Sequence, residues 1–295
     1  MTLIAGVLTN EYVALISDMR VTRLAGGRII SQEDTDTKSI VLGGQFLMGF
    51  TGLARIEGLR IEAWISPVLD GVPTENYFEV LRQKIEEAFL QEGQAGRIPH
   101  AFLAVGYGSL EPGEAVQPLS VTISNSFDAA GTFSPDARVS TQFAISVEKL
   151  GNRRQLVTCA GYPMHDTVRR ALAQRIRVVA KGSPGNPALT VWPLLTALRD
   201  TARRSDGFVG ATALFASMPR CAVPVRMMLT GPGLDYQTLV ASVQLADGAS
   251  GPADGAIRMP AFISPGGHMI GFRMHPGDLS IEEVQAQWDD EDGYR

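Results

Sequence analysis

Short runs of apolar residues, separated by turn-forming residues, dominate the first fifty positions and are typical of strands. Between the first two runs, Asn10-Glu11 predicts a two-residue turn. Between the next two, Gly43-Gly44 predicts a second hairpin, because glycine favours such turns. The polar segment that separates the hairpins is predicted to be a loop. The four strands are expected at 2–9, 12–17, 38–42 and 45–51.

The next part of the chain alternates between pairs of helices and groups of strands. Helices are expected at 53–69, from an N-cap at Thr74 to about 89, at 164–180 and at 189–205. Strands are expected at 100–107, 119–126, 142–148, 155–160, 210–217 and 225–230. This grouping differs from the strict strand–helix alternation of a parallel sheet. It predicts an α+β fold in which two mainly antiparallel sheets stack face to face with helix pairs outside.

The character of the chain changes after Gly231, and the sequence predicts a domain at 1–230 followed by a C-terminal extension at 231–295. The extension is rich in Gly, Pro and Ala. It contains a strand candidate at 237–244, and Ser280 with Glu283 forms a capping-box pattern for a short helix. An acidic tail follows at 289–292. We expect the extension to pack against the sandwich or a neighbouring subunit.

Composition excludes several classes of function. The 295 residues carry a net charge of −5 with a pI of about 5.5, so no basic surface for nucleic acid is expected. No apolar run reaches the roughly 18 residues of a membrane helix, and no signal peptide is recognisable. Two cysteines and four histidines lie at positions without metal-ligand spacing. A cytoplasmic protein without metal or cofactor is predicted.

The predicted hairpins bring polar residues together at their open ends. In the first hairpin, residue 9 pairs with residue 12, so Thr2 lies opposite Met19, between Asp18 and Arg20. In the second, residue 42 pairs with residue 45, so Lys38 lies opposite Gly49. A slip of one residue in either hairpin would turn these side chains to the other face.

This set of residues suits nucleophilic catalysis. A threonine hydroxyl is a weak nucleophile, but a chain-terminal α-amine on Thr2 can accept its proton. A buried Lys38 would supply positive charge, with Asp18 as its partner, and the Gly52 N–H could stabilise an oxyanion. Lysine is scarce here, with four among 26 basic residues. The alternative is structural: Lys38 could protect a sheet edge, and a hairpin can end in Asp and Arg without any function.

Four segments of the chain resemble the proteasome β-subunit superfamily of N-terminal nucleophile hydrolases, which includes the bacterial protease subunit HslV and related bacterial proteasome-like proteins. The segments are Thr2-Leu-Ile-Ala-Gly-Val, Ser17-Asp18-Met19-Arg20-Val21-Thr22, Thr37-Lys38-Ser39-Ile40 and Gly49-Phe50-Thr51-Gly52-Leu53-Ala54. They resemble the mature start, the D-x-R-x-T signature, the lysine strand and the glycine loop of that family. The resemblance implies a four-layer αββα sandwich.

The resemblance also implies residue roles. Thr2 would be the nucleophile and, through its α-amine, the general base. Asp18 and Lys38 would adjust the reactivity of Thr2, Arg20 would support the site, and the Gly52 N–H would form the oxyanion hole. A specificity pocket for an apolar side chain would be walled by Val21, Ile40, Phe50 and Ala54.

Two positions depart from the family pattern. Asp206-Gly-Phe-Val-Gly210 resembles a D-x-x-S-G motif that packs near the nucleophile, but Val209 replaces the serine. Cys159-Ala160-Gly161 falls where a Ser-Gly pair is common, and that serine is also missing. Fewer hydroxyls around the α-amine would mean a changed substrate, a slower enzyme or an inactive ring component.

The function implied by the resemblance is an N-terminal threonine hydrolase that cleaves peptide bonds, as a self-compartmentalising peptidase in a homo-oligomeric ring. Its substrates would be peptides or unfolded proteins, and an ATPase partner is not identified. Met1 must be removed to free the Thr2 amine, and the small side chain of Thr2 suits methionine aminopeptidases. The alternatives are a catalytically inactive ring-forming or structural protein on the same fold and a small-molecule amide hydrolase.

Overall fold

The computed structural model describes most of the first 230 residues and four short stretches of the C-terminal extension. The described residues are 2–25, 28–33, 38–109, 115–128, 133–134, 137–210, 212–220, 226–230, 257–258, 261–263, 269–275 and 280–284. Met1, the predicted strand at 237–244 and the acidic tail at 289–292 lie outside them.

One sheet has five strands in the order β12-β1-β2-β13-β14, and every neighbouring pair is antiparallel. Its strands are β1 (Leu3–Thr9), β2 (Tyr12–Asp18), β12 (Gln155–Gly161), β13 (Ala213–Pro219) and β14 (Arg226–Thr230). The hairpin β1–β2 lies near the centre of this sheet, so the chain segment that begins with Thr2 is flanked by strands on both sides.

The second sheet has nine strands, in the order β11-β10-β9-β6-β5-β16-β17-β15, with β18 also paired to β17. Its strands are β5 (Ser39–Leu42), β6 (Phe46–Thr51), β9 (Ala101–Gly108), β10 (Gln117–Ser124), β11 (Ala144–Lys149), β15 (Ile257–Arg258), β16 (Ala261–Ile263), β17 (Met269–His275) and β18 (Ser280–Val284). All pairings are antiparallel except β5–β16, which is parallel. The α+β class predicted from the sequence is therefore correct, with one parallel exception.

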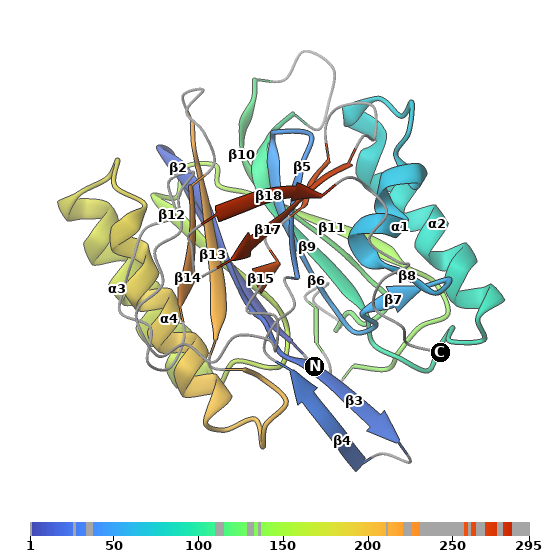
Figure 1. Ribbon diagram of the computed structural model, residues 1–295. Helices are drawn as coiled ribbons and strands as arrows, with labels where there is room; N and C mark the ends of the chain where they lie inside the picture. The colour runs from blue at the N-terminus through green and yellow to red at the C-terminus, as the bar shows by residue number, and fades with distance from the viewer. Residues whose placement is uncertain are drawn as a thin grey trace.

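Two helix pairs enclose the stacked sheets, and Figure 1 shows one pair on each side. The short 3₁₀ helix η1 (Thr74–Asn76) precedes α2. The α-helices are α1 (Ile61–Val68), α2 (Tyr77–Gln91), α3 (Asp166–Gly182) and α4 (Ala188–Ala202). Thr74 was expected to cap the second helix, but it opens the 3₁₀ turn instead. None of the described helices is both long and apolar enough to cross a lipid bilayer.

Three hydrophobic clusters define four layers. One joins α1 and α2 to the nine-stranded sheet, another joins α3 and α4 to the five-stranded sheet, and the third fills the space between the sheets. Strand β1 contributes to two of them, because Leu3 faces α3 and α4 whereas Ile4 faces the other sheet. A strand that is buried on both faces reads as a continuous apolar run, which explains its sequence.

The first hairpin has the predicted register, but the second does not. Ile4 pairs with Ser17, as the Asn10-Glu11 turn requires. In the second hairpin Ser39, not Lys38, pairs with Gly49. Both glycines of the turn have positive φ, but Gln45 stays out of the β5–β6 pairing, and its carbonyl accepts the Tyr107 N–H of β9.

Two further hairpins replace segments that were predicted otherwise. The predicted polar loop contains β3 (Val21–Ala25) and β4 (Arg28–Glu33). The start of the predicted helix at 53–69 is instead a tight hairpin of β7 (Arg55–Ile56) and β8 (Leu59–Arg60). Its turn places Glu57 and Gly58 at positive φ. Because positive φ is uncommon for glutamate, the sequence did not indicate a turn there.

The C-terminal extension contributes strands to the nine-stranded sheet. Ala261–Ile263 pairs with β5, the Gly43 N–H donates to the Ile263 carbonyl over 2.7 Å, and Ile263 is fully buried. The helix predicted from Ser280 and Glu283 is wrong, because 280–284 form β18 paired with β17. Cross-strand pairing outweighs the local capping pattern there.

Candidate active site

Thr2 lies directly before β1 and is 3% exposed. Its carbonyl accepts the Tyr162 N–H over 2.7 Å, and the register of β1 and β2 brings it opposite the end of β2. The next residue, Leu3, donates its N–H to Asp18 Oδ1 over 2.9 Å. Thr2 is thus held directly by the N–H of Tyr162, the residue after β12, and indirectly by Asp18 at the end of β2, which accepts from the next residue, Leu3.

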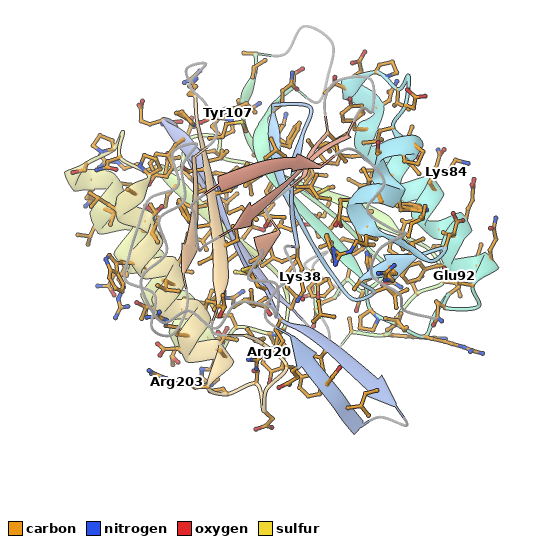
Figure 2. The ribbon with its side chains drawn as sticks, in the orientation of Figure 1. Arg20, Lys38, Lys84, Glu92, Tyr107 and Arg203 are labelled. Atoms are coloured by element: carbon orange, nitrogen blue, oxygen red, sulfur yellow. The ribbon has the colours of Figure 1, made fainter. Side chains whose placement is uncertain are left out.

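Lys38 reaches Thr2 from the other sheet. It lies immediately before β5, and its backbone carbonyl accepts the Phe50 N–H over 3.2 Å. The ammonium group donates to Thr2 Oγ1 and to the Arg20 carbonyl. Of the four lysines, all of which are described, Lys38 alone is buried. Figure 2 shows it near the centre of the molecule, with Lys84 on an outer helix.

Asp18 forms an ion pair with Lys38 and accepts hydrogen bonds from the backbone around the site. Its carboxylate is fully buried and lies 3.6 Å from Lys38 Nζ. It also accepts three backbone N–H bonds, from Leu3, Arg20 and Gly210, at 2.9, 3.2 and 3.1 Å. Burial raises the pKa of the Asp18 carboxyl, and the Lys38 charge and the three N–H groups oppose that rise.

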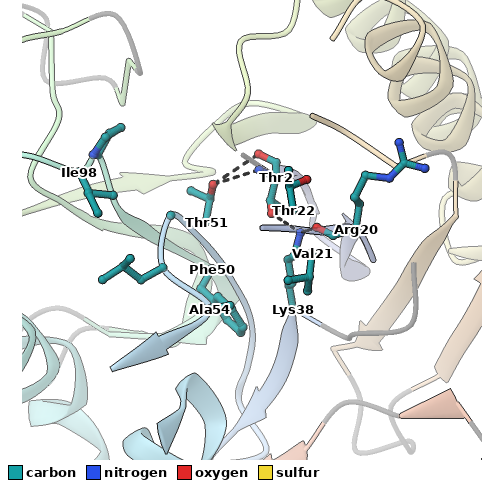
Figure 3. A pocket seen from close by; sticks show the side chains of 12 residues that line it. Thr2, Arg20, Val21, Thr22, Lys38, Phe50, Thr51, Ala54 and Ile98 are labelled. Atoms are coloured by element: carbon teal, nitrogen blue, oxygen red, sulfur yellow. Dashed lines mark hydrogen bonds between the residues drawn. The ribbon is translucent and has the colours of Figure 1, made fainter. Parts of the chain in front are cut away.

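Arg20 joins this site to the loop at 205–210. Its guanidinium points away from Thr2 in Figure 3 and donates to the Gly207 carbonyl over 3.2 Å. The Asp206 side chain is exposed at the surface, and its backbone adopts a positive φ of 48°. Within this loop, the contact with the site comes from the Gly210 N–H on Asp18, whereas Val209 is buried among α3 and α4.

Gly52 follows β6 with a φ of +105°, a conformation that glycine adopts readily. A Cβ there would lie 2.6 Å from His100 Nδ1 and 2.7 Å from the Pro99 carbonyl, so no other residue fits. The next N–H, from Leu53, donates to His100 Nδ1 over 3.2 Å. His100 therefore fixes the turn that carries Gly52.

His100 is fully buried among aromatic rings. It makes edge contacts with Phe89, Phe102 and Phe143 at centroid distances of 5.0 to 6.3 Å. Burial lowers the pKa of the imidazole to about 3. The ring is accordingly neutral at physiological pH, with Nδ1 as the acceptor for Leu53 and the proton on Nε2.

Thr51 and Gly161 enclose Thr2 from the remaining side. Thr51 Oγ1 lies 3.3 Å from the Thr2 nitrogen and 3.5 Å from its carbonyl oxygen. Gly161 has a φ of +95°, and a Cβ there would approach the Thr2 carbonyl oxygen to 1.8 Å. Glycine at 161 is therefore required for Thr2 to lie where it does.

A pocket of about 450 Å³ opens beside Thr2 (Figure 3). Three of the four residues predicted to wall it, Val21, Phe50 and Ala54, lie in its lining. Ile40 does not. It packs in the cluster beneath α1 and α2, because the register of β5 turns its side chain to that face. Arg20, Thr22, Leu53, Ile98 and Pro99 complete the wall, together with Thr2, Lys38, Thr51 and Gly52.

Sequence reasoning missed the contributions of Thr51 and His100. Thr51 carried a signal, because its hydroxyl directly precedes Gly52, which was itself a predicted site residue. His100 had no local signal, since its role depends on Leu53, 47 positions earlier, and on three distant aromatic rings. Among the described residues, no group of three or more His, Cys, Asp or Glu side chains could hold a metal ion.

No family model and no curated protein matches the chain. Among solved structures, it is similar to the Anbu (Gly-1) mutant from Hyphomicrobium sp. strain MC1, with a TM-score of 0.43 and 12% sequence identity. The similarity covers 81% of this chain and 87% of that chain. At this distance the similarity does not assign a family, and the chemistry follows from the residues of the site.

Proposed function

We propose that the chain is an N-terminal threonine hydrolase of the proteasome type, with the Ntn-hydrolase fold, which cleaves amide bonds in peptides. The contact of the Lys38 ammonium with Thr2 Oγ1 carries this proposal, because it pairs a buried cation with a hydroxyl at the start of a strand. The αββα layering and the motifs around Asp18 and Gly52 support it. The role requires removal of Met1, so that the Thr2 nitrogen becomes a free α-amine.

The first chemical step is acyl transfer to threonine. Thr2 Oγ1 forms a bond to the substrate carbonyl carbon while its proton passes to the α-amine. The carbonyl π electrons move to oxygen, and the Gly52 N–H donates to that oxyanion. The C–N bond then breaks, the leaving amine takes the proton from the α-ammonium, and an ester on Thr2 remains.

The second step removes the acyl group. Water gives a proton to the α-amine and attacks the ester carbonyl, and Thr2 leaves with that proton restored. Lys38 favours the deprotonated hydroxyl in both steps, because its positive charge lies against Oγ1. Asp18 keeps that charge paired, because a buried ammonium without a countercharge would be costly.

The pocket beside Thr2 supports the choice of substrate. Val21, Phe50 and Ala54 give it apolar walls, which suits an apolar side chain on the acyl side of the scissile bond. Its opening next to Thr2 places that side chain near the nucleophile. A homo-oligomeric ring that acts in the cytoplasm on peptides or unfolded proteins is the assembly we propose, by resemblance to the proteasome family.

Turnover by three chains tests the proposal: wild type, Thr2→Ala and Thr2→Ser. A fluorogenic peptide with an apolar residue before the scissile amide is the substrate. We expect Thr2→Ala to abolish hydrolysis and Thr2→Ser to keep a measurable rate, because serine retains a hydroxyl and an α-amine. Equal hydrolysis by wild type and Thr2→Ala would contradict the proposal.

The same experiment separates the two alternatives. A non-catalytic ring-forming protein is favoured by the apolar Ala160 and Val209, at 2% and 1% exposure, where the family resemblance would place hydroxyls. It predicts no Thr2-dependent turnover of any substrate. A small-molecule amide hydrolase predicts Thr2-dependent turnover of acyl amides without turnover of peptides, so the substrate panel includes both.

A further inference from the structure

The Thr51 hydroxyl lies against the backbone of Thr2. Thr51 ends β6 and is 3% exposed. Its Oγ1 accepts the Thr2 N–H over 3.3 Å and donates toward the Thr2 carbonyl over 3.5 Å (Figure 3). A hydroxyl has one proton and two lone pairs, so donation to the carbonyl leaves a lone pair directed at the nitrogen.

Within the part of the chain that the structure describes, Thr51 supplies the side-chain acceptor that bonds the Thr2 nitrogen. On the neighbouring strand β12, Gly161 lies against Thr2 and has no side chain that could form a hydrogen bond. Gly161 leaves the space that Thr2 occupies, since a Cβ there would lie 3.2 Å from Thr51 Oγ1 and closer still to the Thr2 carbonyl.

We infer that Thr51 is the positioning residue for the general base: its hydroxyl orients the Thr2 α-amine. This inference rests on the proposed function. A free amine has two or three N–H donors and, when neutral, one lone pair. Engagement of one N–H by Thr51 directs the lone pair away from that hydroxyl and restricts rotation of the amine.

The position of Thr51 in the chain connects this role to the oxyanion. Thr51 and Gly52 are consecutive, so the hydroxyl at the base and the N–H at the oxyanion belong to one short segment. His100 fixes that segment through Leu53. The hydroxyl that orients the general base and the N–H that stabilises the oxyanion are therefore held in one fixed position relative to Thr2.

Charged groups around Thr2 are the same in every variant of residue 51. Among the described residues they are Lys38 on Thr2 Oγ1, Asp18 on the Leu3 N–H and the Arg20 guanidinium on the Gly207 carbonyl. A difference in the pKa of the α-amine between such variants consequently measures the effect of the residue 51 hydroxyl.

Thr51→Val and Thr51→Ser separate the hydroxyl from the packing of residue 51. Valine keeps the branched shape and removes the hydroxyl, whereas serine keeps the hydroxyl. We expect Thr51→Val to lower kcat by about 10–100-fold with KM within about twofold. Thr51→Ser recovers most of that loss. Equal losses in both variants, or a wild-type kcat in Thr51→Val, would overturn the inference.

The α-amine itself can be titrated without turnover, through the pH dependence of its acylation by an anhydride, read by mass spectrometry of the N-terminal peptide. The protein used is the full chain that begins at Thr2. Because the hydroxyl accepts from the ammonium, its removal should lower the amine pKa by about 0.5–1 pH unit in Thr51→Val and not in Thr51→Ser. Identical titrations in all three chains would overturn the inference. Loss of the proposed function alone would appear as Thr2-independent turnover with the titration difference intact.

Discussion

Lys38 Nζ lies 3.6 Å from Asp18 Oδ2, and both side chains are almost completely buried. The two residues come from different sheets, so their ion pair joins the two layers directly beneath Thr2. The same ammonium donates to Thr2 Oγ1. Under the proposed function, this pair therefore contributes both to stability and to the chemistry at Thr2.

Asp18→Asn is expected to lower the free energy of unfolding by about 3–5 kcal/mol, because it leaves the Lys38 ammonium buried without a countercharge. Urea denaturation measures this. Asp200→Asn is the matched control, since Asp200 pairs with Arg203 at the surface, where an ion pair contributes about 1 kcal/mol or less. Equal losses in the two variants would contradict a stabilising role for the buried pair.

Gly52→Ala is expected to lower kcat by about 10²–10³-fold, because the added Cβ would meet His100 Nδ1 and the Pro99 carbonyl and would displace the oxyanion donor. Gly58→Ala is the control. Gly58 also has positive φ, at +78°, but a Cβ there would meet nothing within 4 Å. The prediction fails if the two variants lose the same fraction of kcat.

His100 makes stability depend on pH. Its pKa is lowered from 6.5 to about 3 by burial, so between these values the unfolded chain binds more protons than the folded chain. Stability therefore rises with pH in this window and is lost as the pH falls from 6.5. The contribution of His100 should decrease by about 2 kcal/mol between pH 7 and pH 5.

Denaturation of His100→Asn at both pH values measures that contribution, because asparagine can still accept from Leu53 but does not titrate. The variant should be less stable at pH 7 and should lack this part of the pH dependence. His165→Asn is the control, since His165 is exposed and caps α3. An unchanged pH dependence in His100→Asn would show that His100 does not contribute.

The pocket predicts a preference for peptides with an apolar residue before the scissile bond. Transfer of a charged side chain against Val21, Phe50 and Ala54 would leave it without water. We expect kcat/KM for leucine or phenylalanine at that position to exceed the value for aspartate or lysine by at least about 10-fold. A clear preference for a charged residue would contradict the apolar assignment.

The sequence predicted the first hairpin correctly because its turn has a local signal. Asn10-Glu11 fixes its register, and that register places Asp18 beside Thr2. The second hairpin was predicted one residue out of register. Its turn spans three residues, Gly43 to Gln45, and the Gln45 carbonyl accepts from Tyr107, more than 60 positions away, a contact that no local pattern indicates.

The candidate site was predictable where it depended on residue type and not where it depended on packing. A rare lysine and a hairpin ending in Asp indicated Lys38 and Asp18 from chemistry alone. Ile40 was expected in the pocket, but the true register turns it into the core. Thr51 and His100 act through contacts with residues 49 and 47 positions away, and such contacts exist only in the folded chain.

The most direct test of the central claim is the intact mass of protein purified from cells, before and after treatment with a threonine-directed covalent inhibitor. The account predicts a chain that lacks Met1 and gains one inhibitor adduct, located on Thr2 and absent from Thr2→Ala. A chain that retains Met1 and gains no adduct on Thr2 would contradict it.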